Sequence, residues 1–94
     1  IKGRVKVLES VLESEKINKG DILVTKQTDP GWAMVFPLIS GLIVERGGAL
    51  SHGAIVAREF GIPAVIGISN ITTILKDEDE VILDGDLGKI QLIK

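Results

Sequence analysis

The sequence predicts a single mixed α/β domain with a short-stranded sheet and a few short helices. Three compact apolar runs rich in β-branched residues, residues 22–25, 41–44 and 64–66, are typical of strands buried on both faces. A helix-favouring segment, residues 51–60, lies between the last two runs. The chain has 94 residues, which leaves room for one domain, so we expect residues 1–94 to form it.

The N-terminal part begins with a predicted strand. Residues 3–8 alternate apolar and polar side chains, which favours a half-buried strand. Residues 11–17 carry mixed charges without a clear period and predict neither helix nor strand. Residues 18–21, Asn-Lys-Gly-Asp, are a turn signal before the apolar run that starts at residue 22.

The middle of the chain predicts two helices that start close to strands. Asp29 can cap a short helix that Pro30 opens and Pro37 limits. For residues 51–60, Ser51 is an N-cap candidate and Gly61 a residue that can end the helix.

The C-terminal part predicts a brief helix and a hairpin. Asn70 can cap a helix that runs to residue 74, and residues 76–80 form a charged turn. Two apolar runs, residues 81–83 and 89–92, flank the polar turn Asp-Gly-Asp and predict paired strands.

Composition excludes several classes of function. The net charge is −2 and the basic residues are scattered, so no nucleic-acid partner is expected. With no cysteine and one histidine, neither a disulfide framework nor a zinc site of the usual spacing is available, and we expect no metal on this chain. Residues 32–44 are too short and too interrupted to span a bilayer, and no signal peptide is recognisable, so we expect no membrane partner and a cytoplasmic location. The start at Ile1 rather than Met predicts a piece excised from a larger enzyme.

The stretch from residue 47 to residue 65 carries the chemistry. Gly47 and Gly48 follow a buried strand, and Ser51 and His52 open a helix. Glycines let backbone N–H groups approach an anion, and the first turn of a helix has unpaired N–H groups that favour a phosphoryl group. A neutral imidazole at this point can act as a nucleophile. The pattern predicts His52 as the nucleophile.

The neighbours of His52 predict supporting roles. Gly47, Gly48, Ser51 and Gly53 are candidate phosphate-binding residues, and Arg58, on the same wedge of the helix as His52, could help if a partner domain brings the phosphate to it. Position alone is also compatible with an exposed or capping histidine, with a simple Gly-Gly turn, and with Arg58 on a solvated helix face.

Residues 47–65 closely resemble the phosphohistidine signature of the PEP-utilising enzyme family, which includes phosphoenolpyruvate synthase, pyruvate phosphate dikinase, enzyme I of the sugar phosphotransferase system and rifampicin phosphotransferase. Residues 20–25 with 28–32 resemble the lead-in of the synthase and rifampicin-phosphotransferase branches, and residues 81–92 resemble the closing hairpin. The resemblance covers residues 3–93.

The resemblance implies a swivelling β/β/α mobile domain with a phosphorylated histidine at His52. It implies a phosphotransferase in which phosphate passes from an ATP-binding (ATP-grasp) domain to an acceptor-binding domain of the same enzyme. ATP and Mg²⁺ would bind to the partner domain, and this domain would bind no cofactor and have no activity alone. A stand-alone phosphocarrier protein and a non-catalytic structural or interaction module are the alternatives.

Two positions depart from the family's common pattern. Leu50 stands where synthases and dikinases typically have Thr, and Gly53 stands where they usually have Ala. The missing hydroxyl removes one possible phosphate donor. An apolar residue before Ser-His-Gly is closer to the rifampicin-phosphotransferase-like members, and this favours that branch.

Overall fold

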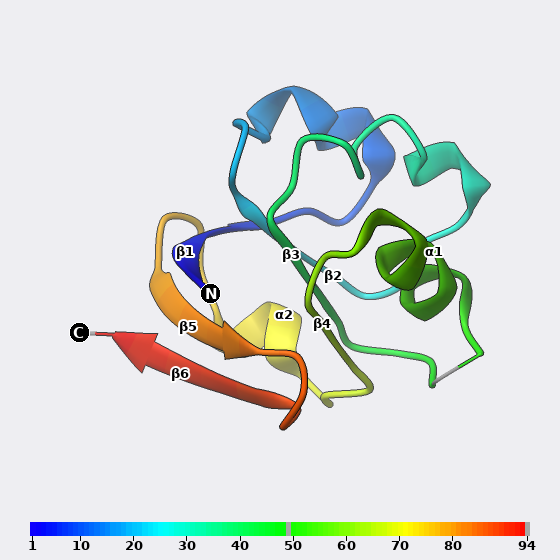
Figure 1. The fold of residues 1–94 in the computed structure, drawn as a ribbon. Helices are drawn as coiled ribbons and strands as arrows, with labels where there is room; N and C mark the ends of the chain where they lie inside the picture. Colours follow the sequence, from blue (N-terminus) through cyan, green and yellow to red (C-terminus); the bar gives the residue numbers. More distant parts are fainter. Residues whose placement is uncertain (49, 94) are drawn as a thin grey trace.

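The computed structural model describes residues 1–48 and 50–93 as one six-stranded mixed sheet with helices on both sides (Figure 1). The strand order is β4-β3-β2-β1-β5-β6, and all elements except η1 follow the sequence predictions in order. The strands are β1 (Lys2–Val7), β2 (Ile22–Thr25), β3 (Gly41–Val44), β4 (Ala64–Ile66), β5 (Glu80–Asp84) and β6 (Lys89–Ile93). The helices are η1 (Val11–Lys16), η2 (Pro30–Trp32), α1 (His52–Phe60) and α2 (Ile71–Ile74), of which η1 and η2 are 3₁₀ helices.

The sheet joins a parallel part to an antiparallel part at β1. Strands β1 to β4 pair in parallel, with Leu23 opposite Leu42 and Ile43 opposite Val65. Strand β5 pairs antiparallel with β1 and with β6. Every residue of β2 and of β3 is buried, which explains why these strands are continuous apolar runs.

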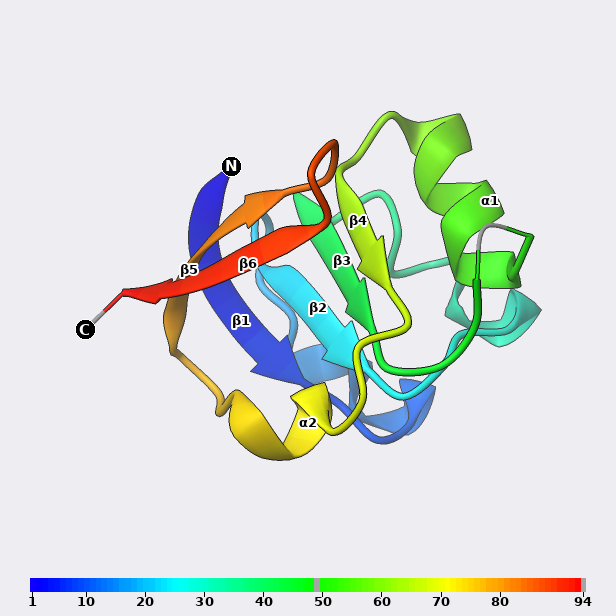
Figure 2. The ribbon, with the colours of Figure 1, turned by 90° about the horizontal axis from the view of Figure 1, so that it is seen from below.

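Two apolar clusters cover the two faces of the parallel strands. Leu23 and Leu42 face the cluster that contains Trp32, Phe36 and Ala57, and therefore face α1 and η2. The residues that alternate with them on β2 and β3 face a second cluster, formed with α2 and the β5–β6 hairpin; its buried members are Val5, Ile22, Val24, Ile43, Val65, Ile71, Leu75, Val81 and Leu83. Figure 2 shows the β5–β6 hairpin beside β1, with its turn reaching the start of β4. The layers are therefore β, β and α, which confirms the predicted fold class.

Strand β1 departs from simple alternation. Val5 and Lys6 are both buried, although they point to opposite sides of the strand. The Lys6 ammonium forms an ion pair with Glu78, a residue with a left-handed backbone (φ 72°), so its charge is compensated. The predicted half-buried strand is confirmed, but its polar side is partly covered by the turn before β5.

Residues 11–17, for which the sequence predicted no element, contain η1. The Ser10 hydroxyl oxygen accepts a hydrogen bond from the Leu12 N–H at 3.1 Å. The Glu13 carboxylate accepts one from the Glu9 N–H at 2.8 Å. Ser-x-x-Glu is the capping-box pattern, so the signal for a helix start was present in the sequence. In the described residues, no helix is long and apolar enough to cross a membrane.

Candidate functional site

The candidate site lies where the parallel strands β2 and β3 end and where α1 begins (Figure 1). In a parallel sheet the carboxyl ends of neighbouring strands meet at one edge, so the loops that follow them come together there. His52 is the first residue of α1 and is partly exposed. Both properties agree with the prediction of an accessible histidine at a helix start.

Ser51 occupies the N-cap position, as predicted, but its side chain does not cap α1. The Ser51 hydroxyl instead donates a hydrogen bond to the carbonyl oxygen of Gly48 at 2.8 Å. The first turn of α1 therefore receives no acceptor from its N-cap side chain, and this end of the helix can attract an anion.

Thr28 holds the His52 ring. Its hydroxyl oxygen Oγ1 lies 2.9 Å from Nδ1 of the imidazole. Thr28 belongs to the loop that follows β2, 24 residues before the histidine. The sequence analysis included residue 28 in the segment that resembles the family's lead-in and predicted no role for Thr28. Its place directly after a buried parallel strand was the signal that could have identified it.

The Phe36 ring supports the imidazole from the core side. The centroids of the two rings are 6.2 Å apart and the rings are inclined by 76°, an edge-to-face contact. Phe36 is buried and also stacks on Phe60, with centroids 5.9 Å apart. Thr28 and Phe36 together restrict the rotation of the His52 side chain.

The three candidate glycines differ in what they do. Gly47 has φ +111°, and a Cβ there would lie 2.8 Å from the Cβ of Ser51. A Cβ on Gly53 would lie 3.0 Å from Thr28 Oγ1, so Gly53 gives room to the hydroxyl that holds His52. A Cβ on Gly48 would meet nothing within 4 Å. Residue 49 of the motif lies outside the described residues.

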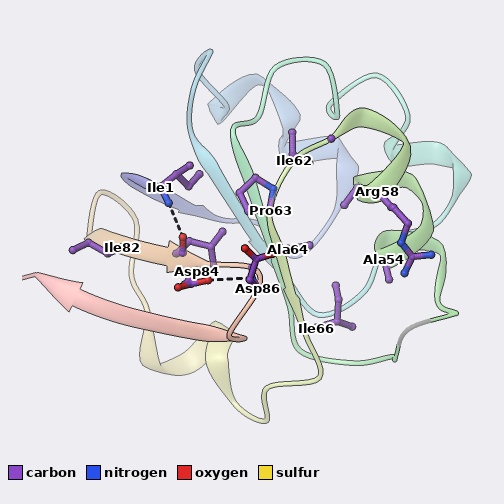
Figure 3. A pocket seen from close by; sticks show the side chains of 14 residues that line it. Ile1, Ala54, Arg58, Ile62, Pro63, Ala64, Ile66, Ile82, Asp84 and Asp86 are labelled. Carbon is purple, nitrogen blue, oxygen red and sulfur yellow. Dashed lines mark hydrogen bonds between the residues drawn. The ribbon is translucent and has the colours of Figure 1, made fainter.

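Arg58 is not brought together with the other candidate residues. It lies six positions along α1 and lines a groove of about 790 Å³ between α1, β4 and the β5–β6 turn (Figure 3). Asp84 and Asp86 line the same groove. Gly47, Ser51 and Gly53 instead line a smaller cavity of about 220 Å³ with Thr28. The Arg58 side chain therefore belongs to a different part of the surface from this cavity.

Glu45 ties the loop after β3 to α2. One oxygen of its carboxylate accepts hydrogen bonds from the Thr72 hydroxyl at 2.7 Å and from the Thr72 N–H at 3.2 Å. The Thr72 hydroxyl, followed by the Thr72 N–H, lowers the pKa of the Glu45 carboxyl from its ordinary value of 4.5. The carboxylate therefore stays ionised to a more acidic pH than a free glutamate.

The arrangement suits an uncharged nucleophile. If Nδ1 carries the proton and donates it to Thr28 Oγ1, the lone pair of Nε2 is free to attack. In residues 1–48 and 50–93, Nδ1 is the imidazole nitrogen with a hydrogen-bond partner. Over the same residues there is no cluster of three or more His, Cys, Asp or Glu side chains that could hold a metal ion.

Comparison with known proteins identifies the family. A family model described as "PEP-utilising enzyme, mobile domain" matches residues 17–88, and the chain belongs to this family. The chain is 43% identical over 93 residues to rifampicin phosphotransferase from Bacillus cereus, covering 99% of this chain and 11% of that protein. It is 48% identical over 89 residues to phosphoenolpyruvate synthase from Aeropyrum pernix, covering 94% of this chain and 11% of that protein.

A solved structure agrees with this assignment. The solution structure of an Enzyme I protein matches with a TM-score of 0.72 and 29% identity, over 85% of this chain and 33% of that one. The chain spans about a tenth of the length of the curated relatives named above. It is therefore a domain of the kind found in multidomain PEP-utilising phosphotransferases, as the resemblance implied.

Proposed function

We propose that this chain is the phosphoryl-carrying domain of a phosphotransferase and that His52 carries the phosphoryl group. The observation that carries the proposal is the Thr28–His52 contact at the start of α1. It holds Nδ1 and leaves Nε2 as the nucleophilic atom on a partly exposed ring. The names of the relatives, rifampicin phosphotransferase and phosphoenolpyruvate synthase, support this class of reaction.

The transfer has two balanced steps. The Nε2 lone pair attacks phosphorus, the P–N bond forms, and the bond to the donor oxygen breaks with its electron pair on that oxygen. Attack places positive charge on the ring, and the Nδ1–H group shares it with Thr28 Oγ1. An acceptor oxygen then attacks phosphorus, the P–N bond breaks with its electron pair returning to Nε2, and the acceptor proton passes to a base or to water.

The remaining parts of the reaction belong to other domains in this proposal. An ATP-grasp domain would bind ATP and Mg²⁺ and supply the phosphoryl group, and an acceptor-binding domain would take it up. The 94-residue chain would then have no turnover alone. Leu50, which is 86% exposed beside the nucleophile, offers no hydroxyl to the phosphate and favours an acceptor of the rifampicin-phosphotransferase kind.

Labelling tests the proposal. The enzyme that contains this domain is incubated with Mg²⁺ and ATP labelled in the β or γ phosphate. We expect an acid-labile, base-stable label on His52, absent from His52→Gln, whose circular dichroism spectrum stays that of the wild type. An enzyme that turns over without any label on His52 would rule the proposal out.

A further inference from the structure

A cavity of about 220 Å³ is lined by Thr28, the residue whose hydroxyl contacts Nδ1 of His52. Its lining combines an arginine, a carboxamide and two hydroxyl groups with backbone and apolar surface: Gln27, Thr28, Val44, Arg46, Gly47, Ser51 and Gly53. We propose that this cavity binds a phosphoryl dianion through Arg46 and Gln27. The inference deepens the proposed function and rests on it, since the dianion would be the group that His52 transfers.

The two walls of the cavity are held together by an extension of the sheet. Beyond the last paired residues of β2 and β3, the Glu45 N–H donates to the Thr25 carbonyl at 3.0 Å and the Arg46 N–H donates to the Lys26 carbonyl at 2.8 Å. The backbone of Arg46 is therefore held by hydrogen bonds to the segment that leads from β2 to Gln27. A cation on a fixed backbone binds with a smaller loss of conformational entropy than one on a free loop.

The charges around the cavity favour an anion. Arg46 lines it, whereas no carboxylate is among its lining residues. Two acids are adjacent in sequence to lining residues, and neither lines the cavity: the Glu45 carboxylate is bound to Thr72, and the Asp29 carboxylate accepts a hydrogen bond from the Gly31 N–H. The planar guanidinium can offer two parallel N–H donors to a phosphoryl group.

Arg58 is the competing candidate for the same role. The groove that it lines also contains Asp84 and Asp86 (Figure 3). Two carboxylates in one groove repel a phosphoryl dianion, because like charges raise its free energy. The cavity lined by Arg46 also contains Thr28, which contacts the His52 ring, and no carboxylate lines it; the groove lined by Arg58 contains two carboxylates and not Thr28.

Two measurements test the inference. Binding of inorganic phosphate to the 94-residue chain is followed by the amide chemical shifts of Gly47 and Ser51, in the wild type and in His52→Ala. The rate of His52 phosphorylation is measured in the complete enzyme. Each measurement is repeated for Arg46→Gln, Arg46→Lys and Arg58→Gln. Arg4→Gln is the control, because Arg4 lies on β1, pairs with Glu78 and does not line the cavity.

We expect Arg46→Gln to weaken phosphate binding and to slow phosphorylation by about ten-fold or more, as loss of a charge-assisted hydrogen bond implies. Arg46→Lys should recover part of both effects, and Arg4→Gln should change neither. Phosphate binding that depends on Arg46 while His52 is never labelled would support the cavity and defeat the proposed function. Three results would each overturn the inference. They are a normal rate of His52 labelling in Arg46→Gln, phosphate-induced shifts that do not depend on Arg46, and a loss of phosphate binding and labelling in Arg58→Gln alone.

Discussion

At the scale of single residues, the chemistry proposed for His52 depends on the hydroxyl of one threonine. A free imidazole exchanges between two neutral tautomers, and only the one protonated at Nδ1 has a nucleophilic Nε2. Thr28 Oγ1 lies 2.9 Å from Nδ1 and can accept its proton. In the proposed mechanism Thr28 is a positioning residue: its hydroxyl accepts the Nδ1 proton and so favours the tautomer with a nucleophilic Nε2.

Thr28→Val removes this hydroxyl and keeps the shape of the side chain. A neutral hydrogen bond contributes about 0.5–1.5 kcal/mol, so the rate of His52 phosphorylation should fall about 2- to 10-fold. The ¹⁵N shifts of the imidazole should show a mixture of tautomers in Thr28→Val and a predominantly Nδ1-protonated ring in the wild type and in Thr28→Ser. Identical tautomer populations in Thr28→Val and the wild type would contradict this role.

Gly47 and Gly48 make a matched pair for a second test. Gly47→Ala places a Cβ on a backbone with φ +111° and 2.8 Å from the Ser51 Cβ, so it should lower the free energy of unfolding by about 1–3 kcal/mol. Gly48→Ala meets nothing within 4 Å and should change it by less than about 0.5 kcal/mol. Urea denaturation measures both, and equal effects would show that the Gly47 conformation is not required.

At the scale of elements, the loop after β3 is fixed by its contact with α2. The Glu45 carboxylate accepts two hydrogen bonds from Thr72, the second residue of α2. This contact joins the loop that carries Arg46 and Gly47 to an element on the opposite face of the sheet. Motion of α2 should therefore affect the site without touching His52.

The lowered pKa of Glu45 gives this contact a pH dependence. Because the folded state favours the ionised carboxylate, its contribution to stability is present above the unfolded pKa near 4.5 and is lost as the pH falls through the lowered folded pKa. Glu45→Gln should be less stable than the wild type at pH 7, and the difference should shrink below about pH 4.5. Urea midpoints across this range measure it, with Glu15→Gln on η1 as the control. A difference that is independent of pH would refute the ionic origin.

The sequence predicted most elements because their signals are local. The runs that became β2 and β3 are apolar throughout, and Ser51 and Gly61 do flank α1. The 3₁₀ helix η1 was missed because its charged residues mask the helical period. Ser51 occupies the predicted N-cap position, but its hydroxyl donates to the Gly48 carbonyl instead of capping α1, a choice between nearby backbone groups that sequence does not reveal.

At the scale of the whole molecule, one sheet separates two apolar clusters and should make them unfold together. Leu23 belongs to the cluster that includes Trp32, whereas Ile43 belongs to the cluster on the other face. Because the strands carry both sets of side chains in alternation, loss of either cluster removes support for the same backbone.

Leu23→Ala and Ile43→Ala test this cooperativity. Each truncates a fully buried side chain and should cost about 2–5 kcal/mol of unfolding free energy. Trp32 fluorescence and far-ultraviolet circular dichroism should report the same midpoint in both variants. If the Trp32 fluorescence midpoint of Ile43→Ala stayed at the wild-type value while the circular dichroism midpoint fell, the two faces of the sheet would unfold independently.

The assembly of the site is the part that sequence predicted least. His52 and its glycines are adjacent in the chain, so their motif identified them, whereas Thr28 and Phe36 reach the imidazole only through the sheet topology. The helix wheel put Arg58 on the same wedge as His52 but deeper along the helix, and in the structure Arg58 lines the groove beside the β5–β6 turn. Long-range neighbours are set by packing, which one sequence does not encode in its local pattern.

Kinetic competence of phospho-His52 is the most direct measurement of the central claim. The complete enzyme is mixed rapidly with ATP, quenched in alkali at short times, and the phosphoryl occupancy of His52 is determined by mass spectrometry. We predict that the phosphoryl group appears on His52 and leaves it at rates no slower than turnover. Product that forms faster than His52 is phosphorylated would contradict the account.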